Sequence, residues 1–285
     1  MVTVAQALSD AKSRLNTEVI ENSGFDAVCL FEKAFGIKYR TLEYENLKNT
    51  QADENQLRIL DEFVSRRVLR EPLQYILGEW EFYGRSFFVG KGVLIPRQDT
   101  ETLIDMAVMK FKDRKGLKVA DLCSGSGCIG LTLEKELDCQ STMLVELSDE
   151  ALKYLNRNCQ LHNSSAEIVH GDVVDEKTVS RFNELDLIVC NPPYLTDDDM
   201  STLQREVKHE PSTALYGGND GLEFYRGITR LWKNTLADGG MLAFEIGLNQ
   251  ERDVSQILIQ HGFENVRYIK DLCGINRVVF GIRKL

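Results

Sequence analysis

From Lys118 to Arg283 the chain alternates apolar runs with amphipathic segments, and this alternation restricts its fold more than any other feature. Short β-branched runs predict buried strands, and apolar residues at helical spacing predict helices. Strands that alternate with helices predict an α/β fold with a mostly parallel, doubly wound sheet covered on both faces. We expect strands at residues 118–122, 141–147, 166–170, 186–190, 240–246 and 277–283. We expect helices at residues 129–136, 149–161 (capped by Ser148), 222–236 and 250–260.

Residues 3–70 carry a different pattern, which predicts helices alone. Apolar residues recur at helical spacing, as in Val4, Leu8, Ala11 and Leu15. Asp53 is placed to cap the last of these helices, with Gln56 at its third position. The arginines of that helix, Arg66, Arg67 and Arg70, are interpreted as a solvated face. We predict a small helical bundle at residues 1–75 that docks a partner or covers a site.

An aromatic-rich stretch separates the helical region from the alternating one. Residues 79–83 and 86–89 flank a turn at Gly84-Arg85, which predicts a β-hairpin. We therefore expect a hairpin linker at residues 76–96 and a second domain at residues 97–285. A chain of 285 residues is long enough for two domains.

Composition limits the classes of partner and site. The formal net charge of −10 argues against nucleic acid as the main partner, since backbone binding relies on clustered Lys and Arg. The seven cysteines form no C-x-x-C pair and the four histidines lack metal-ligand spacing, so we expect reduced thiols, no metal and a cytoplasmic protein. The sequence shows no signal peptide and no run approaching the roughly 20 apolar residues of a membrane span.

A glycine-rich loop follows the first predicted strand of the second domain. It reads Asp-Leu-Cys-Ser-Gly-Ser-Gly at residues 121–127. Glycines at a strand-to-helix turn let a ligand approach the backbone, and the helix N-terminus offers free N–H groups. Glu146 lies at the end of the next strand, about twenty residues on, where an acidic side chain binds ribose hydroxyls. Both features indicate an adenosine cofactor.

The tetrapeptide Asn191-Pro192-Pro193-Tyr194 ends the apolar run at residues 187–190. Ligands of open α/β sheets bind at this end of the strands, and a residue before proline is held out of the helical conformation. The Asn191 side-chain oxygen and the Pro192 carbonyl can each accept one hydrogen of a planar NH2 group, and Tyr194 adds an aromatic face. This slot suits methyl transfer to an amide or exocyclic nitrogen, catalysed mainly by positioning and electrostatic pre-organisation.

The cofactor is open to two interpretations. Residues 125–130 match the pattern G-x-G-x-x-G, so a nicotinamide-dependent oxidoreductase is an alternative. Three features favour S-adenosylmethionine instead. Asp121 can receive the methionine ammonium, the fourth strand ends in the amide-binding loop, and no second phosphate-binding half follows.

With these residues identified, the chain resembles the release-factor glutamine methyltransferases (the PrmC/HemK family) over most of its length. The matching segments, in the family's order, are residues 72–78, 81–84, 93–97 with Thr100-Glu101, 121–127, 191–194, 209–211 and 217–222. Asn-Pro-Pro-Tyr also occurs in nucleic-acid methyltransferases that modify adenine N6 or guanine N2. The helical domain and the hairpin linker are therefore the discriminating part.

The resemblance implies a class I, Rossmann-like S-adenosylmethionine-dependent methyltransferase domain after the helical domain. It implies methylation of the side-chain amide nitrogen (N5) of the glutamine in the Gly-Gly-Gln motif of class 1 release factors, bound transiently by a monomer. The expected cofactor-binding residues are Asp121, Cys123, Ser124, Gly125, Ser126, Gly127, Glu146, Asp172, Val173 and Asn191, with Val173 beside the adenine. The expected substrate-binding residues are Asn191, Pro192, Pro193, Tyr194 and Arg97, of which Asn191, Pro192 and Tyr194 are the expected catalytic residues.

Two positions depart from the family's pattern. Cys123 stands where glycine is usual and would be strained if its φ were positive. Glu146 stands where aspartate is common. Besides the oxidoreductase, the sequence leaves two alternatives: a nucleic-acid base methyltransferase, and a non-catalytic binding module that acts through its helical domain.

Overall fold

A computed structural model describes residues 1–17 and 20–284 of the chain. The chain divides into two compact units. The helical unit comprises Met1–Glu79 together with Gln204–His209, and the sheet unit comprises Trp80–Leu203 and Glu210–Leu285. The helical unit therefore includes a short segment from far along the sequence. Among the described residues, no helix is long and apolar enough to cross a membrane.

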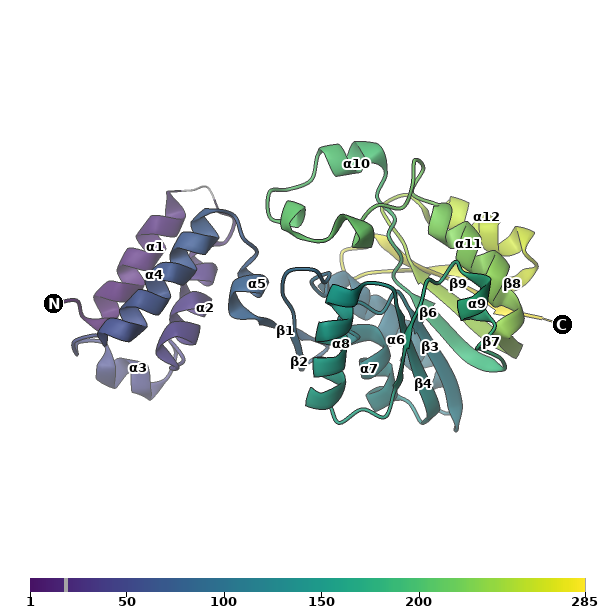
Figure 1. Ribbon diagram of the computed structural model, residues 1–285, viewed down its shortest axis with the longest axis horizontal. Coiled ribbons are helices and arrows are strands. Elements are labelled where there is room, and N and C mark those ends of the chain that lie inside the picture. Colours follow the sequence, from purple (N-terminus) through teal and green to yellow (C-terminus); the bar gives the residue numbers. More distant parts are fainter. Residues whose placement is uncertain (18–19, 285) are drawn as a thin grey trace. The chain divides into compact units, whose positions relative to one another are not determined.

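The helical unit is built from packed helices (Figure 1). Apolar residues on these helices are buried, as the 3.6-residue spacing predicts. Its helices are α1 (Val4–Asn16), α2 (Ser23–Phe35), α3 (Leu42–Leu47), α4 (Glu54–Val68) and α5 (Leu73–Leu77). The apolar residues predicted to face the core of α1 are buried. The Asp53 side chain caps α4 by accepting from the backbone N–H groups of Asn55 and Gln56, at 2.9 and 3.1 Å. The predicted helix start is thus confirmed.

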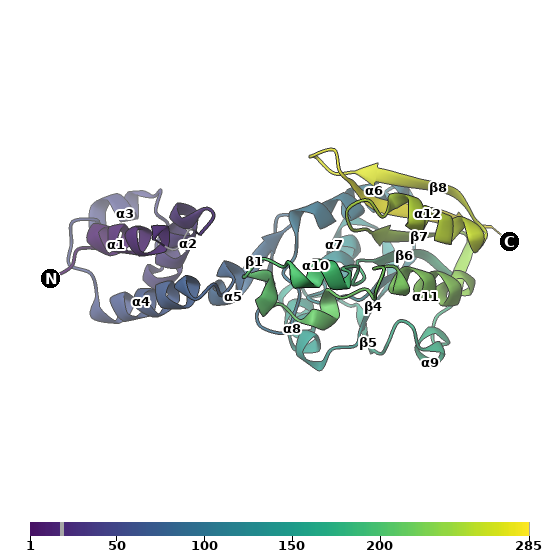
Figure 2. The same cartoon turned by 90° about the horizontal axis from the view of Figure 1, so that it is seen from above.

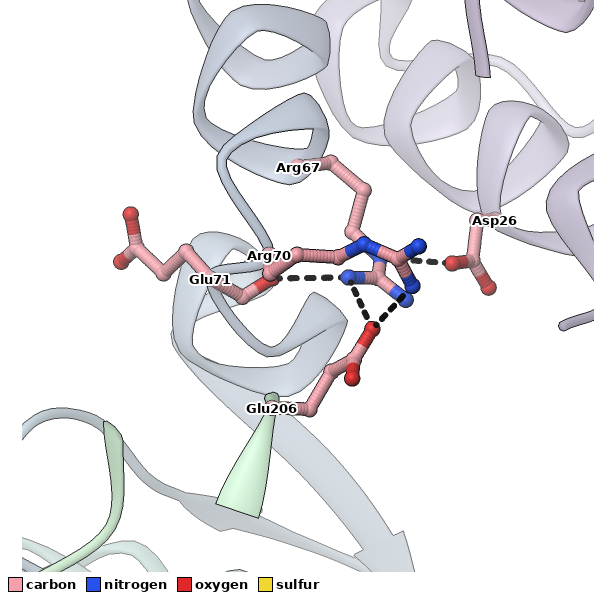
Figure 3. Close-up of polar contacts among 5 residues, drawn as sticks. All are labelled: Asp26, Arg67, Arg70, Glu71 and Glu206. Carbon is pink, nitrogen blue, oxygen red and sulfur yellow. Dashed lines mark hydrogen bonds and ion pairs between the residues drawn. The ribbon is translucent and has the colours of Figure 1, made fainter. Parts of the chain in front are cut away.

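The arginines at the end of α4 do not form a solvated face, so that interpretation is wrong. Arg67 is 6% exposed and Arg66 and Arg70 are half-buried. Each pairs with a carboxylate. Arg66 pairs with Glu71. Arg67 pairs with Asp26 and Glu206, and Arg70 pairs with Glu206 (Figure 3). The helical spacing of these arginines gave no sign of acceptors that come from other parts of the chain.

The sheet unit contains a seven-stranded sheet in the order β5-β4-β3-β6-β7-β9-β8. Its strands are β3 (Leu117–Leu122), β4 (Cys139–Glu146), β5 (Glu167–His170), β6 (Leu185–Cys190), β7 (Leu236–Glu245), β8 (Phe263–Lys270) and β9 (Asn276–Arg283). The first five strands in this order are parallel, and β9 runs antiparallel to β7 and β8. The mostly parallel sheet is confirmed. Leu122 pairs with Cys190, so the loops that follow β3 and β6 begin side by side.

Helices cover both faces of this sheet (Figure 1). One face is covered by α6 (Glu101–Phe111), α7 (Cys128–Glu136) and α8 (Asp149–Leu161), and the other by α9 (Glu176–Val179), α11 (Glu223–Trp232) and α12 (Glu251–Gln260). The short helix α10 (Asp197–Ser201) lies between β6 and β7 in the sequence. The Ser148 side chain caps α8 by accepting from Ala151 N–H. The predicted hairpin forms from β1 (Glu79–Phe82) and β2 (Arg85–Phe88), with positive φ at Tyr83 and Gly84 in its turn.

Two element predictions in the C-terminal part need correction. The strand expected at residues 240–246 begins at Leu236, because Gly239 (φ +72°) forms an irregularity inside the strand and not its boundary. The helix expected to reach residue 236 consequently ends at Trp232. Strand β8 was not predicted: it lies at the sheet edge beside α12 (Figure 2), and its mostly exposed side chains lack the apolar alternation of a half-buried strand.

Candidate active site

A cavity of about 290 Å³ opens at the C-terminal ends of the parallel strands in the sheet unit. This is near the lower end of the roughly 300–1,000 Å³ range of ligand pockets. Among the predicted site residues, its lining includes Arg97, Cys123, Ser124, Gly125, Ser126, Glu146, Asp172, Val173, Asn191 and Pro193. Asp121, Gly127, Pro192 and Tyr194 are not part of the lining. The roles of all these residues stay predictions, but the structure brings most of them to one cavity.

The loop after β3 has a backbone that needs small or unusual residues. Cys123, Gly125 and Gly127 have φ of +59°, +56° and +82°. A Cβ at Gly127 would lie 2.5 Å from Leu155 Cδ1, so the close approach of α8 also demands glycine there. Cys123 therefore adopts the left-handed conformation, which is strained for a residue with a side chain.

Glu146 holds this loop in place. Its Oε2 accepts from Gly125 N–H and its Oε1 accepts from Ser148 N–H, both at 2.7 Å. A carboxylate offers about four acceptor positions, so two remain for a ligand in the cavity that Glu146 lines. These free acceptor positions suit a ligand with hydroxyl groups, as the predicted ribose contact requires.

Asp121 is fully buried at the end of β3. Its Oδ2 accepts from Gly130 N–H at 2.9 Å, while its Oδ1 has no hydrogen-bond partner in the described part of the chain. Burial raises the pKa of Asp121 to about 7, although the Gly130 N–H bond opposes the shift. In this structure Asp121 fastens the start of α7. Asp121 does not line the cavity, so its contact with a ligand ammonium stays a prediction.

Asp172 and Val173 form part of the cavity wall. Val173 is 4% exposed, and its carbonyl accepts from the indole N–H of Trp232 at 2.7 Å. Trp232 is fully buried in α11. This bond connects the core under α11 directly to the cavity wall.

The Asn191–Tyr194 loop is fixed by a second loop, residues 215–221. Tyr194 N–H and Leu195 N–H both donate to Leu215 O, at 3.2 and 2.8 Å. A Cβ at Gly217 would lie 2.6 Å from Tyr194 Cα, and one at Gly221 would lie 2.3 Å from Tyr194 O. The two glycines are thus required for backbone to pack on backbone at this point.

Gln250 also holds the Asn191–Tyr194 loop in place. The sequence analysis did not identify this residue. Its Nε2 donates to Tyr194 O and Gly221 O, each at 3.2 Å. Its Oε1 accepts from Gly247 N–H at 2.9 Å and from the Tyr225 hydroxyl at 3.3 Å. All four hydrogen-bonding positions of one amide are used. Nothing in the local sequence distinguishes Gln250 from any other polar residue at the start of a helix.

Glu210 and Glu245 are two further buried acids that the sequence analysis gave no role. Glu210 is 6% exposed, accepts from Ile95 N–H at 3.0 Å and pairs with Arg97. Glu245 is 2% exposed at the end of β7, and its Oε2 has no hydrogen-bond partner among the described residues. A carboxylate inside the apolar run of residues 241–246 was the available signal for Glu245.

Glu245 is expected to make folding stability pH-dependent. Burial raises its pKa to about 7, against the opposing hydrogen bond from Thr100. The unfolded chain loses this proton at a pKa of about 4.3, so the stabilisation is complete below that pH and is lost as the pH rises through 7. Glu245→Gln is neutral throughout. From pH 5 to pH 8 its unfolding free energy, measured by urea titration, should fall less than that of the wild type.

The comparison of the wild type with Glu245→Gln isolates Glu245, because burial raises the pKa of Asp121 in both proteins. Glu264→Gln on the exposed edge strand is the control and should behave as wild type. Equal pH dependence of the wild type and Glu245→Gln would contradict the prediction.

Comparison with known proteins gives matches over both units. A family model described as the PrmC N-terminal domain matches residues 6–78, and one described as the methyltransferase small domain matches residues 98–218. The chain is 38% identical over 236 residues to a release factor glutamine methyltransferase of Clostridium acetobutylicum, covering 82% of each chain. It is 36% identical over 280 residues to one of Geobacter sulfurreducens, covering 98% of this chain and 96% of that protein.

A solved methyltransferase structure from Pyrococcus furiosus aligns with a TM-score of 0.54 at 18% identity. The alignment covers 72% of this chain and 91% of that one. At this level of identity the likeness concerns the fold, and it agrees with the class I methyltransferase fold expected from the sequence.

Proposed function

Because the chain belongs to the release factor glutamine methyltransferase family, we propose that it methylates the side-chain amide nitrogen (N5) of glutamine in the Gly-Gly-Gln motif of class 1 peptide-chain release factors. The methyl donor is S-adenosylmethionine, which leaves as S-adenosylhomocysteine. The observation that carries this proposal is the position of Asn191: its amide lines the cavity at the end of β6, opposite the glycine loop that follows β3.

The cofactor supplies an activated methyl group when it is bound. We assign its ribose to Glu146, its adenine to the wall formed by Asp172 and Val173, and its methionine part to the loop at residues 123–127. The chemistry of these residues fits such a ligand: free acceptor positions on Glu146, an apolar wall at Val173, and positive-φ glycines that leave the backbone accessible.

The substrate nitrogen is a weak nucleophile because its lone pair is delocalised into the amide. Asn191 and the Pro192 carbonyl accept its two hydrogens, which directs the lone pair at the methyl carbon. The buried proline pair and the bonds to Tyr194 hold these acceptors still. Catalysis is then positioning and electrostatic pre-organisation, and the proton leaves to solvent after transfer.

We assign the release factor to the side of the cavity where Arg97, which lines the cavity, pairs with Glu210. The protein acts as a cytoplasmic monomer that binds its partner transiently through the helical unit. The net charge of −10 is poorly suited to nucleic acid as the substrate. Burial raises the pKa of the Tyr194 hydroxyl, so this O–H stays neutral. Because Tyr194 does not line the cavity, we assign its role to the loop that presents Asn191.

The test is transfer of label from S-adenosylmethionine to purified release factor. The matched controls are a release factor with Gly-Gly-Ala in place of Gly-Gly-Gln, and a nucleic acid. Label on the native factor alone supports the proposal for both substrate and target residue. Label on nucleic acid, with none on the factor, would overturn it in favour of a base methyltransferase.

Gln250→Ala is expected to slow transfer without weakening cofactor binding. The change frees Tyr194 O and Gly221 O, and so loosens the loop that presents Asn191. Misplacing reacting groups by about 1 Å can cost roughly 100-fold, so we expect a fall in kcat of about 10- to 100-fold. The dissociation constant for S-adenosylmethionine, measured by calorimetry, should stay within about twofold, since Gln250 does not line the cavity.

The matched control is Gln256→Ala, in the helix that begins directly after Gln250. Among the described contacts, Gln256 makes no hydrogen bond to the loop. An unchanged kcat in Gln250→Ala would show that the loop keeps its position without this amide.

A further inference from the structure

The end of α4 holds a cluster of buried charges that the proposed reaction does not use. Arg67 Nε donates to Asp26 Oδ2 at 2.7 Å, and each of these side chains is 7% exposed. Arg67 also donates to the Glu71 carbonyl at 3.3 Å. Burial raises the pKa of Asp26, against the effect of Arg67. A charge removed from water in this way requires partners, and Arg67 has one within its own unit in Asp26.

The remaining partner, Glu206, comes from far along the sequence (Figure 3). Its Oε1 accepts from both Arg67 and Arg70, each at 3.1 Å. Burial by itself would raise the pKa of Glu206, but the bonds from Arg70 and Arg67 outweigh burial and lower it. Glu206 is therefore held as a carboxylate by two guanidinium groups, and its segment, Gln204–His209, belongs to the helical unit.

This segment is the middle of a longer stretch, residues 195–215, which we name the substrate loop. The substrate loop begins one residue after Asn191-Pro192-Pro193-Tyr194. One peptide bond after His209 comes Glu210, which accepts from Ile95 N–H and pairs with Arg97. Pro211, Thr213 and Ala214 then line the cavity. The chain thus runs from the ion pairs of Glu206 to the cavity wall within five residues, Glu206 to Pro211.

We propose that Glu206 is a positioning residue for methyl transfer, and that Arg67 and Arg70 hold the centre of the substrate loop as part of the helical unit. The course of the loop at Glu210 and Pro211 then depends on this anchor. The helical unit serves the chemical step as well as partner docking. This inference rests on the proposed function, because it concerns the substrate side of the same site.

Glu206→Gln is the variant that tests the anchor. It removes the charge but keeps the size of the side chain, and it leaves the buried Arg67–Asp26 pair in place, so the unit retains its own core. Arg67 itself is unsuitable, because its loss would leave Asp26 as an unpaired buried charge. Asp61→Asn is the matched control: it breaks an exposed ion pair with Arg14 in the same unit and does not involve the loop.

The readouts are kcat, KM for the release factor, the dissociation constant for S-adenosylmethionine, and amide hydrogen exchange over residues 195–215. For Glu206→Gln we expect kcat to fall about 10-fold, because a displaced loop holds the reacting groups out of place. KM and cofactor affinity should stay within about threefold of the wild-type values. Exchange in the substrate loop should quicken. Glu206→Asp, which keeps the charge, should recover most of the lost kcat, and Asp61→Asn should match the wild type.

Other results would overturn the inference. A raised KM with unchanged kcat would mean that Glu206 serves docking alone. Unchanged exchange in the substrate loop would mean that the ion pairs do not hold it. Failure of the proposed function is seen separately, as a wild-type protein that does not methylate the factor. In that case the exchange comparison between wild type and Glu206→Gln still decides whether the anchor exists.

Discussion

Asn191→Ala is expected to reduce methyl transfer by about 10³-fold, while S-adenosylmethionine still binds. Loss of a single preorganised hydrogen-bonding group at a reaction centre commonly costs about 10²- to 10³-fold in kcat. In the proposed mechanism the Asn191 oxygen accepts a hydrogen of the attacking nitrogen itself, and no second side-chain amide lines the cavity among the described residues. The effect should therefore lie at the upper end of this range.

The measurement is single-turnover transfer to release factor, with cofactor affinity determined by calorimetry on the same preparation. Most of the proposed cofactor contacts lie on the loop after β3 and at Glu146, so the dissociation constant should rise by only a few fold. Asn156→Ala, on the exposed face of α8, is the control and should transfer at the wild-type rate. Transfer that survives in Asn191→Ala would show that the proposed hydrogen-bond mechanism is wrong.

Trp232→Ala is expected to destabilise the sheet unit by about 3–5 kcal/mol, the usual cost of removing a large aromatic side chain from a core. Trp232 is fully buried, and its ring lies 4.7 Å from the ring of Phe182 between centroids. The variant also leaves Val173 O without its N–H donor at the wall of the cavity. We therefore expect weaker cofactor binding as well as lower stability.

Urea unfolding followed by circular dichroism measures this loss, because fluorescence would change with the removal of one of the two tryptophans. Trp232→Phe is the matched variant: it keeps an aromatic ring but not the N–H, and should lose only about 1–3 kcal/mol, the cost of leaving a buried acceptor unpaired. If Trp232→Ala lowered the unfolding free energy by less than about 1 kcal/mol, the surrounding core would have collapsed into the cavity left by the side chain, contradicting the prediction.

Much of the site could be predicted because its residues stand at strand ends, which sequence patterns locate well. The apolar runs before Cys123 and Asn191 predicted two buried strands, and parallel pairing of Leu122 with Cys190 brings the following loops together. Glu146 was found in the same way, at the end of the next strand. These residues carry recognisable chemistry in a fixed position relative to a strong local pattern.

Gln250, Glu210 and Glu245 could not be found by the same means. Gln250 meets Tyr194 across 56 positions of sequence, and Glu210 meets Ile95 across 115. Gln250 and Glu210 are ordinary polar residues in their local context, whereas Glu245 interrupts an apolar run, which marks it as unusual without showing its role. Each of these side chains has its role because the fold leaves certain backbone groups without partners. Which groups these are depends on how several elements pack together.

The arginines of α4 also show that local sequence patterns do not reveal distant partners. Helical periodicity correctly predicted α4, but periodicity describes only which residues share a face, not what covers that face. Arg67 is buried because Asp26 lies 41 positions before it and Glu206 lies 139 positions after it.

The sequence by itself determined the helical region, the mostly parallel sheet, the hairpin and the loops that bear Cys123 and Asn191, because each follows from short-range periodicity and from residues with restricted backbones. Only the tertiary structure decided which carboxylates and amides hold those loops in place. Burial and hydrogen-bond satisfaction are properties of the whole fold, and no local pattern contains the distant partner on which they depend.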